Sequence, residues 1–248
     1  MISFYTSLYK LGPTQQMAIQ SWRASVPDCE VLFFGSASDA MSTGLEMHSV
    51  EVSETGKPIV SDLFRAARAA AQFNVLCYIN ADIVVTPRLF EAALVVNGEV
   101  PPPWMILGQR WDTTVDYDVD FQDPEWGDRL ISSVMADKRT RLHPTSGMDY
   151  FITRGDVWGD EIPPYKLGCF AWDTDLMCIA LERNVPVIDA TIVNPVFHLD
   201  HKIFNRRDTP DAKYNLELLG RDGDFHTRLR GTQHATWTMG PDFEIREK

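Results

Sequence analysis

Short apolar runs alternate with segments of helical periodicity through the first hundred residues of the chain. The runs are rich in β-branched and aromatic residues, whereas Leu63, Ala67 and Ala71 are spaced as on one face of a helix. The pattern predicts strands at residues 2–8, 30–35, 47–52 and 75–79, and helices at residues 15–25, 36–43, 61–72 and 87–96. Strands that alternate with helices predict an α/β fold with a mainly parallel central sheet and helices on both faces.

The second half is less regular. It predicts strands at residues 104–111, 149–153, 186–191 and 196–201, and amphipathic helices at residues 125–138 and 173–184. From Lys202 onward the pattern weakens, and only residues 214–219 are typical of a helix. We therefore expect a single domain over residues 1–201 and a C-terminal extension, residues 202–248, that packs on or near the functional site.

The overall charge narrows the possible partners. The 248 residues carry a formal net charge of −12 and no basic stripe, which argues against nucleic acid or an anionic membrane surface as a partner. A bound diphosphate would therefore need a metal ion, an arginine or a helix N-terminus to offset its charge. The four cysteines lack CxxC spacing, and neither a signal peptide nor a transmembrane segment is evident. These features predict reduced thiols and a cytoplasmic protein.

Candidate chemistry begins at the end of the most apolar strand, Val75–Ile79. The strand is followed by Asn80-Ala81-Asp82, two short polar side chains separated by one residue. The carboxyl end of a strand in a parallel sheet is where ligands bind, and a carboxylate there can hold a divalent cation that also contacts nucleotide phosphates. The alternative is that Asn80 and Asp82 only cap a turn between strand and loop.

Two later segments supply further polar groups. Asp173, Thr174 and Asp175 open a predicted helix, where carboxylates can cap the helix as well as act on a substrate. His198 and His201 follow the last apolar strand, and imidazole together with carboxylate suits manganese-like ions. A histidine at a strand end can equally be a hydrogen-bonded structural residue.

Two loops are candidates for the walls of a sugar or acceptor pocket. Arg110 and Trp111 end one predicted strand, and Asp149 follows a glycine turn. Aromatic faces stack on sugar rings, while arginine and aspartate hydrogen-bond to hydroxyls or phosphate. A salt bridge between strand ends is the alternative interpretation.

Several segments, in this order and spacing, resemble bacterial family 2-like glycosyltransferases of the GT-A fold. They are TSLYK after the first strand, SWRASVPDCEVLFFG, YINADIVV, GQRWD, SGMDYF, WDTDL, PVIDAT and the His198 segment. The resemblance covers residues 2–201. It implies a hexosyltransferase-like enzyme with a nucleotide-diphosphate sugar as donor, a glycan or other hydroxyl compound as acceptor, and Mn²⁺ or Mg²⁺ as cofactor.

The resemblance also implies roles for individual residues. Asn80 stands where the family's Asp-x-Asp motif has its first acid, and Trp172 replaces an acid before the family's catalytic base, whose place Asp173 takes. Asp82 and His198 would hold the cation, with His201 as second choice for the histidine. The donor would contact Thr6, Arg65, Asn80 and Asp82, and the sugar or acceptor would contact Arg110, Trp111, Asp149 and Trp172.

Two other classes of function stay open. A catalytically silent module that binds nucleotide sugars or glycans would keep the same fold and the same clefts. A sugar-phosphate nucleotidyltransferase is less favoured, because the glycine-rich loop and lysine expected after the first strand are missing beyond Leu8. No Walker loop, GxGxxG or GxSxG motif is present either.

Overall fold

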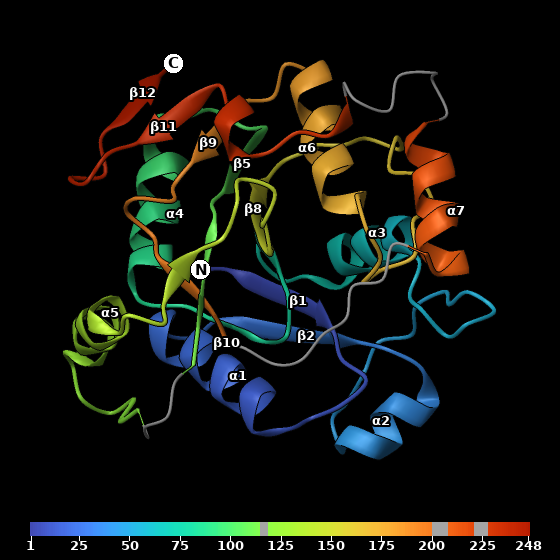
Figure 1. The fold of residues 1–248 in the computed structure, drawn as a ribbon, viewed down its shortest axis with the longest axis horizontal. Coiled ribbons are helices and arrows are strands. Elements are labelled where there is room, and N and C mark those ends of the chain that lie inside the picture. The colour runs from blue at the N-terminus through green and yellow to red at the C-terminus, as the bar shows by residue number, and fades with distance from the viewer. Residues whose placement is uncertain (115–118, 200–207, 221–227) are drawn as a thin grey trace.

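The computed structural model describes residues 1–114, 119–199, 208–220 and 228–248 (Figure 1). The first half alternates strands and helices, as its hydrophobic pattern predicts. Its elements are β1 (Ser3–Ser7), α1 (Pro13–Ser25), β2 (Glu30–Phe34), α2 (Ala37–Thr43), α3 (Val60–Ala70), β3 (Val75–Ile79), β4 (Ile83–Val84) and α4 (Arg88–Glu99).

The strand predicted at residues 47–52 is wrong. His48 forms an isolated bridge to Phe34, and Val52 forms another to Pro58. Proline has no backbone N–H, so a ladder cannot continue through it. The apolar residues of this segment therefore lie in a loop beside the edge of the sheet.

The second half contains more and shorter strands than its sequence pattern predicts. Its elements are β5 (Trp104–Leu107), β6 (Arg110–Thr113), α5 (Trp126–Ala136), β7 (Arg141–Leu142), β8 (Tyr150–Arg154), α6 (Trp172–Glu182), β9 (Val187–Asp189), β10 (Val196–Leu199), α7 (Pro210–Leu219), a 3₁₀ turn (Thr232–His234), β11 (Trp237–Met239) and β12 (Ile245–Glu247). The single strand predicted at residues 104–111 is two strands, β5 and β6, which belong to different sheets.

The large sheet has eight strands in the order β12-β11-β9-β5-β8-β3-β1-β2. The pairs β1–β2, β1–β3, β5–β9 and β9–β11 are parallel, whereas β8 and β12 run antiparallel to their neighbours. In register, Ile79 at the end of β3 lies opposite Tyr150 at the start of β8. The residue after Ile79 and the residue before Tyr150 therefore meet at one edge of the sheet.

The small sheet has four strands in the order β4-β10-β6-β7. After β5 the chain leaves the large sheet at Gly108 and enters β6 of the small sheet two residues later. A Cβ atom at Gly108 would lie 2.6 Å from the hydroxyl oxygen of Tyr150 and 3.2 Å from the backbone nitrogen of Thr191. Only glycine allows the chain to change sheets at this point without displacing its neighbours.

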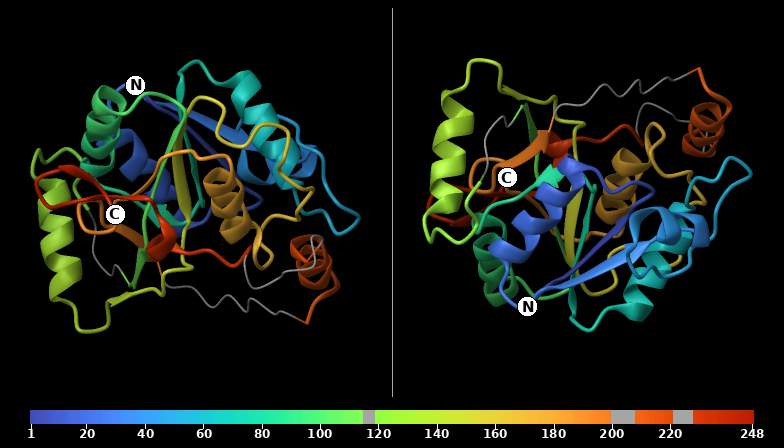
Figure 2. Two further views of the ribbon diagram at one scale, coloured as in Figure 1. Left: turned by 90° about the horizontal axis from the view of Figure 1, so that it is seen from above. Right: turned by 90° about the horizontal axis from the view of Figure 1, so that it is seen from below.

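Helices cover both faces of the large sheet, which confirms the predicted α/β fold (Figures 1 and 2). Side chains alternate along each strand, so Phe4 points toward α1, α4 and α5, and Tyr5 points toward α3 and α6. Two apolar clusters result. We call the cluster with Phe4 the α1-side core and the cluster with Tyr5 the α3-side core.

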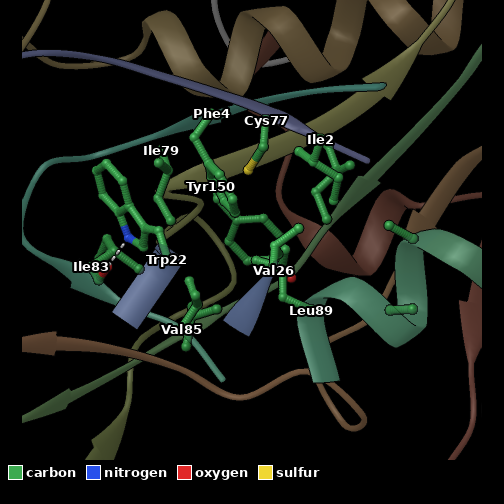
Figure 3. Close-up of a cluster of buried hydrophobic side chains, with 14 of the residues drawn as sticks. Ile2, Phe4, Trp22, Val26, Cys77, Ile79, Ile83, Val85, Leu89 and Tyr150 are labelled. Carbon is green, nitrogen blue, oxygen red and sulfur yellow. Dashed lines mark hydrogen bonds between the residues drawn. The ribbon is translucent and has the colours of Figure 1, made fainter. Parts of the chain in front are cut away.

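Trp22 links the α1-side core to the small sheet (Figure 3). Its fully buried indole stacks on Phe4 with ring centroids 5.7 Å apart. Its Nε1–H donates a hydrogen bond to the carbonyl oxygen of Ile83, at a distance of 2.8 Å. Because Ile83 belongs to β4, this bond fixes the edge of the small sheet to the scaffold.

Part of the predicted C-terminal extension completes the large sheet. β11 pairs in parallel with β9, and β12 pairs with β11. The stretch at residues 202–248 therefore shares a sheet with the first 201 residues. None of the helices in the described ranges is long and apolar enough to cross a membrane.

Candidate active site

A cavity of about 890 Å³ opens at the edge where β3 ends and β8 begins. Four parts of the chain line it: the turn after β3, the small sheet, the loop before β8 and the first turn of α6. Its polar lining includes Asn80, Asp82, Arg110, Asp112, Arg139, Arg141, His143, Asp149, Asp173 and His198. The carboxyl edge of a mainly parallel sheet is where α/β proteins place their ligands.

The surroundings of Asn80 explain why an amide stands there. Its Oδ1 accepts a hydrogen bond of 2.7 Å from the hydroxyl of Tyr78, and its Nδ2 donates to a carboxylate oxygen of Asp149. An amide can accept at one end and donate at the other, whereas an ionised carboxylate only accepts. An ionised aspartate at this position would place two carboxylates against each other. The hydrogen bonds to Tyr78 and Asp149 therefore favour asparagine where the Asp-x-Asp pattern has its first acid.

Arg110 holds two of the cavity's carboxylates. Its Nη1 lies 2.7 Å from Asp149 Oδ2, and its Nε lies 2.9 Å from Asp112 Oδ1. Burial lowers the pKa of the guanidinium, but the two carboxylates outweigh that effect and raise it. Arg110 therefore stays charged and neutralises much of the negative charge of both aspartates.

Asp112 also contacts two histidines. Its Oδ2 lies 2.6 Å from His143 Nδ1, and its Oδ1 lies 3.4 Å from His198 Nδ1. Burial works against the ionised form, yet the hydrogen bond from His143 and the charge of Arg110 bring the pKa of Asp112 below its usual value. Asp112 is thus an ionised carboxylate that orients both imidazole rings.

Asp82 and His198 meet on the side of the small sheet nearest to β3. The Nε2 of His198 lies 3.6 Å from Asp82 Oδ2, on the opposite side of the ring from Asp112. Within the described ranges, no group of three or more metal-binding side chains converges on one point. One carboxylate and one imidazole fit a Mg²⁺ or Mn²⁺ ion that takes its remaining ligands from phosphate and water.

Asp173 lies half-buried in the first turn of α6 and faces the cavity. Loss of hydration raises its pKa to about 7, and the negative charge of Asp149 adds to this shift. Its Oδ1 accepts a hydrogen bond of 3.0 Å from the backbone N–H of Thr174. A helix N-terminus alone would lower the pKa of a carboxyl, but here burial and the charge of Asp149 dominate. Asp173 can therefore both hold and release a proton near neutral pH.

Asp175, two residues further on, has the opposite surroundings. It is completely buried, its Oδ2 accepts a 2.6 Å hydrogen bond from the hydroxyl of Tyr165, and its Oδ1 lies 2.7 Å from Arg228 Nη1. It does not line the cavity. Asp175 is a structural residue that ties α6 to the C-terminal segment.

The residues before Asp173 shape the cavity floor. Trp172 is buried against Tyr78, Phe64 and Phe151 in the α3-side core and also lines the cavity. Ala171 adopts a left-handed conformation with φ of 81°. This is a strained backbone for a residue with a Cβ atom, and such strain is frequent at functional sites.

The structure brings seven of the predicted site residues to the cavity: Asn80, Asp82, Arg110, Asp149, Trp172, Asp173 and His198. Three others lie elsewhere. Thr6 is buried in β1 on the same side as Phe4, and Trp111 packs against the α1-side core because side chains alternate along β6. Arg65 projects into solvent from α3 beside Asp62, since Leu63 and Phe64 take the inward face. His201 lies outside the described residues.

Sequence reasoning missed the roles of four lining residues. Asp112 ends the GQRWD segment, in which only Arg110 and Trp111 were predicted to line a pocket, and His143 lies in no predicted element. Arg141 belongs to a strand of two residues, too short for its periodicity to stand out, and Arg139 lies in the turn before it. The spacing in Arg139-Thr140-Arg141-Leu142-His143 could have indicated these residues. Basic side chains recur there at every second residue, as on one side of an extended segment.

Comparisons with known proteins define the fold. No family model matches the sequence, and no curated protein matches it either. Among solved structures, a fragment of S. aureus TarS in complex with UDP-GlcNAc superimposes with a TM-score of 0.57 at 13% identity, over 92% of this chain and 69% of that one. A glucosyl-3-phosphoglycerate synthase from Mycobacterium tuberculosis, in complex with Mg²⁺ and UDP, gives a TM-score of 0.50 at 14% identity, over 100% and 87%. This chain therefore has the GT-A fold that its sequence resembles.

Proposed function

We propose that this protein is a hexosyltransferase-like enzyme that moves a sugar from a nucleotide-diphosphate donor to a hydroxyl group of an acceptor. The observation that carries the proposal is the meeting of Asp82, His198 and Asp173 around one cavity at the carboxyl edge of a GT-A sheet. Asp82 and His198 face each other, and Asp173 lines the same cavity.

Asp82 and His198 are the residues that would hold a divalent cation. Their facing oxygen and nitrogen atoms, 3.6 Å apart, leave the other ligand positions to the donor's phosphates and to water. When bound, such a cation would offset the negative charge on the leaving diphosphate. The chain needs this help, because Arg110 is already paired with Asp149 and Asp112.

Asp173 is the proposed general base. It accepts the proton of the acceptor hydroxyl as that oxygen bonds to the anomeric carbon of the sugar. The bond from that carbon to the diphosphate breaks at the same time, and its electron pair leaves with the diphosphate. Attack from the face opposite the leaving group inverts the anomeric configuration. A base with a pKa near the working pH is well matched to this step.

The nucleotides bound by the two solved structures guide the first donors to test. Both are complexes of UDP or a UDP-sugar. The experiment incubates the protein with UDP-, GDP- and TDP-sugars, with and without Mn²⁺, and measures release of nucleoside diphosphate. Release from one donor, lost in EDTA, supports the proposal.

The other outcomes separate the alternatives. Tight donor binding without release, for all donors and with simple hydroxyl acceptors present, identifies a silent binding module. Pyrophosphate release from a nucleoside triphosphate plus a sugar phosphate identifies a nucleotidyltransferase. Either result would overturn the proposal.

A further inference from the structure

Three basic side chains in and beside the short strand β7 line one part of the cavity. Arg139, Arg141 and His143 recur at every second residue, and of these only Arg141 lies within β7 (Arg141–Leu142). Thr140 and Leu142, the residues between them, do not line the cavity, and Leu142 is 41% exposed. The spacing of two residues thus places Arg139, Arg141 and His143 on the cavity side.

The charges of these three residues are compensated to different degrees. His143 contacts Asp112 at 2.6 Å, and Arg139 lies 2.7 Å from Asp137 while 63% of its side chain is exposed. Arg141 is exposed and forms no ion pair within the described part of the chain. Asp112, its partner in the β6–β7 ladder, is already occupied by Arg110 and two histidines. Arg141 therefore presents an unneutralised guanidinium to the cavity.

This positive charge lies at the far end of the cavity from the proposed donor end. Asp82 directly precedes β4, and the strands of the small sheet follow in the order β4, β10, β6, β7. Neighbouring strands lie about 4.8 Å apart, so β7 is about 14 Å from β4. That separation exceeds the reach of one arginine side chain. A diphosphate held beside Asp82 and His198 therefore leaves Arg141 available for another ligand.

We propose that Arg139 and Arg141 bind an anionic group, a phosphate or a carboxylate, on the acceptor. This inference rests on the proposed function, which defines the donor end and the position of the base. Asp173 lines the same cavity as both ends. The acceptor would place its hydroxyl at Asp173 and its anionic group at β7.

The electrostatics of the chain support an anion at this wall. The net charge of −12 and the aspartates of the cavity repel anions over most of the surface. The cluster of Arg139, Arg141 and His143 is therefore a local exception in an acidic protein. A guanidinium can donate two parallel hydrogen bonds to a phosphate or carboxylate, which gives both affinity and orientation.

The test measures direct binding in the absence of donor, so it needs no turnover. Isothermal titration and arginine Nε–H NMR shifts compare glucose 6-phosphate, glucuronate and glucose, and inorganic phosphate serves as a minimal probe. The variants are Arg141→Gln, Arg139→Gln and the double variant. Arg246→Gln is the matched control, because Arg246 is also an exposed arginine on an edge strand, β12, but lies outside the cavity.

The expected result is that charged probes bind at least tenfold more tightly than glucose. Each arginine substitution should weaken charged probes by roughly 10- to 100-fold, as expected for loss of a charge-assisted hydrogen bond. UDP affinity should stay within about twofold, and Arg246→Gln should change nothing. Whichever of glucose 6-phosphate and glucuronate binds more tightly identifies the anionic group.

Three results would overturn the inference. Equal binding of glucose and the charged probes removes its basis. A charged probe that displaces UDP, or an Arg141→Gln variant that loses UDP affinity, assigns the arginines to the donor. Failure of the proposed function gives a different result, because no donor then releases nucleoside diphosphate. Anion binding at Arg141 is measured without donor, so its outcome is independent of that result.

Discussion

The two sheets of this molecule divide its tasks. The large sheet lies between two layers of helices, and its central strands β1, β5 and β8 are almost entirely buried. The small sheet has strands of two to four residues and supplies Arg110, Asp112, Arg141 and His198 to the cavity. The comparison indicates that one sheet provides stability and position, whereas the other provides several of the charged groups of the cavity.

The division is testable because the two roles give different measurements. Substitutions that face the cavity should change turnover or binding and leave the free energy of unfolding nearly unchanged. Substitutions inside the scaffold should lower the free energy of unfolding and leave the chemistry of the folded protein intact. Two acids on α6, Asp173 and Asp175, provide the sharpest pair, since they are two residues apart.

The largest effect is expected from Asp173→Asn. Loss of a positioned general base commonly lowers the rate by about two to four powers of ten. Asparagine keeps the side-chain oxygen that accepts from the N–H of Thr174, so the start of α6 should stay intact. Turnover is measured with the donor found active, and donor affinity by titration. Near wild-type turnover, or a product that retains the donor's anomeric configuration, would show that Asp173 is not the base.

Asp175→Asn should have the opposite signature. The substitution leaves Arg228, only 11% exposed, without its buried carboxylate. Breaking such a buried pair costs about 3–5 kcal/mol of unfolding free energy. Urea unfolding measures the loss, and Glu182→Gln is the control, because Glu182 meets Arg228 at 3.5 Å but is half exposed. If the Asp175→Asn variant were as stable as wild type but had reduced turnover, Asp175 would not have the purely structural role that distinguishes it from Asp173.

Sequence periodicity predicts the scaffold because burial forces a repeat on the chain. β1, β2, β3, α1, α3 and α4 were all predicted within a few residues, since each has an apolar face that must meet a core. The break at Gly108 was not predicted. It depends on the approach of Tyr150 and Thr191, which are distant in sequence.

The site was predictable only in part for the same reason. Asn80, Asp82 and Asp173 follow or open long regular elements, so their places at the sheet edge follow from topology. The small sheet has strands too short to show a period, and its pairing is set by contacts across the whole chain. Asp112, Arg139, Arg141 and His143 were therefore missed, and Trp111 was assigned to the wrong side of its strand.

A smaller effect is expected from Asp112→Asn. Asp112 orients His198 from the side opposite Asp82, and loss of such a partner typically lowers metal affinity by about 10- to 100-fold. Mn²⁺ binding followed by electron paramagnetic resonance gives the affinity without turnover. Asp156→Asn, outside the cavity and 55% exposed, is the control. Unchanged Mn²⁺ affinity would mean that the His198 ring is held by other contacts.

The last prediction concerns pH. The protonation of Asp173 should change both the stability of the protein and its turnover. The folded protein holds the Asp173 proton up to a pKa of about 7, well above the usual value of 3.8 for this side chain. The stability contributed by that proton is full below about pH 4 and is lost as pH rises through 7. Asp173→Asn, neutral at every pH, should therefore have a higher melting temperature than wild type at pH 8 and show no such gain at pH 4.

Wild-type turnover should rise about tenfold per pH unit below 7 and level off above it, because only the ionised base accepts a proton. If the melting temperatures of the two proteins changed with pH in the same way, or if the rate profile had no inflection near pH 7, Asp173 would not be the group that titrates near neutral pH.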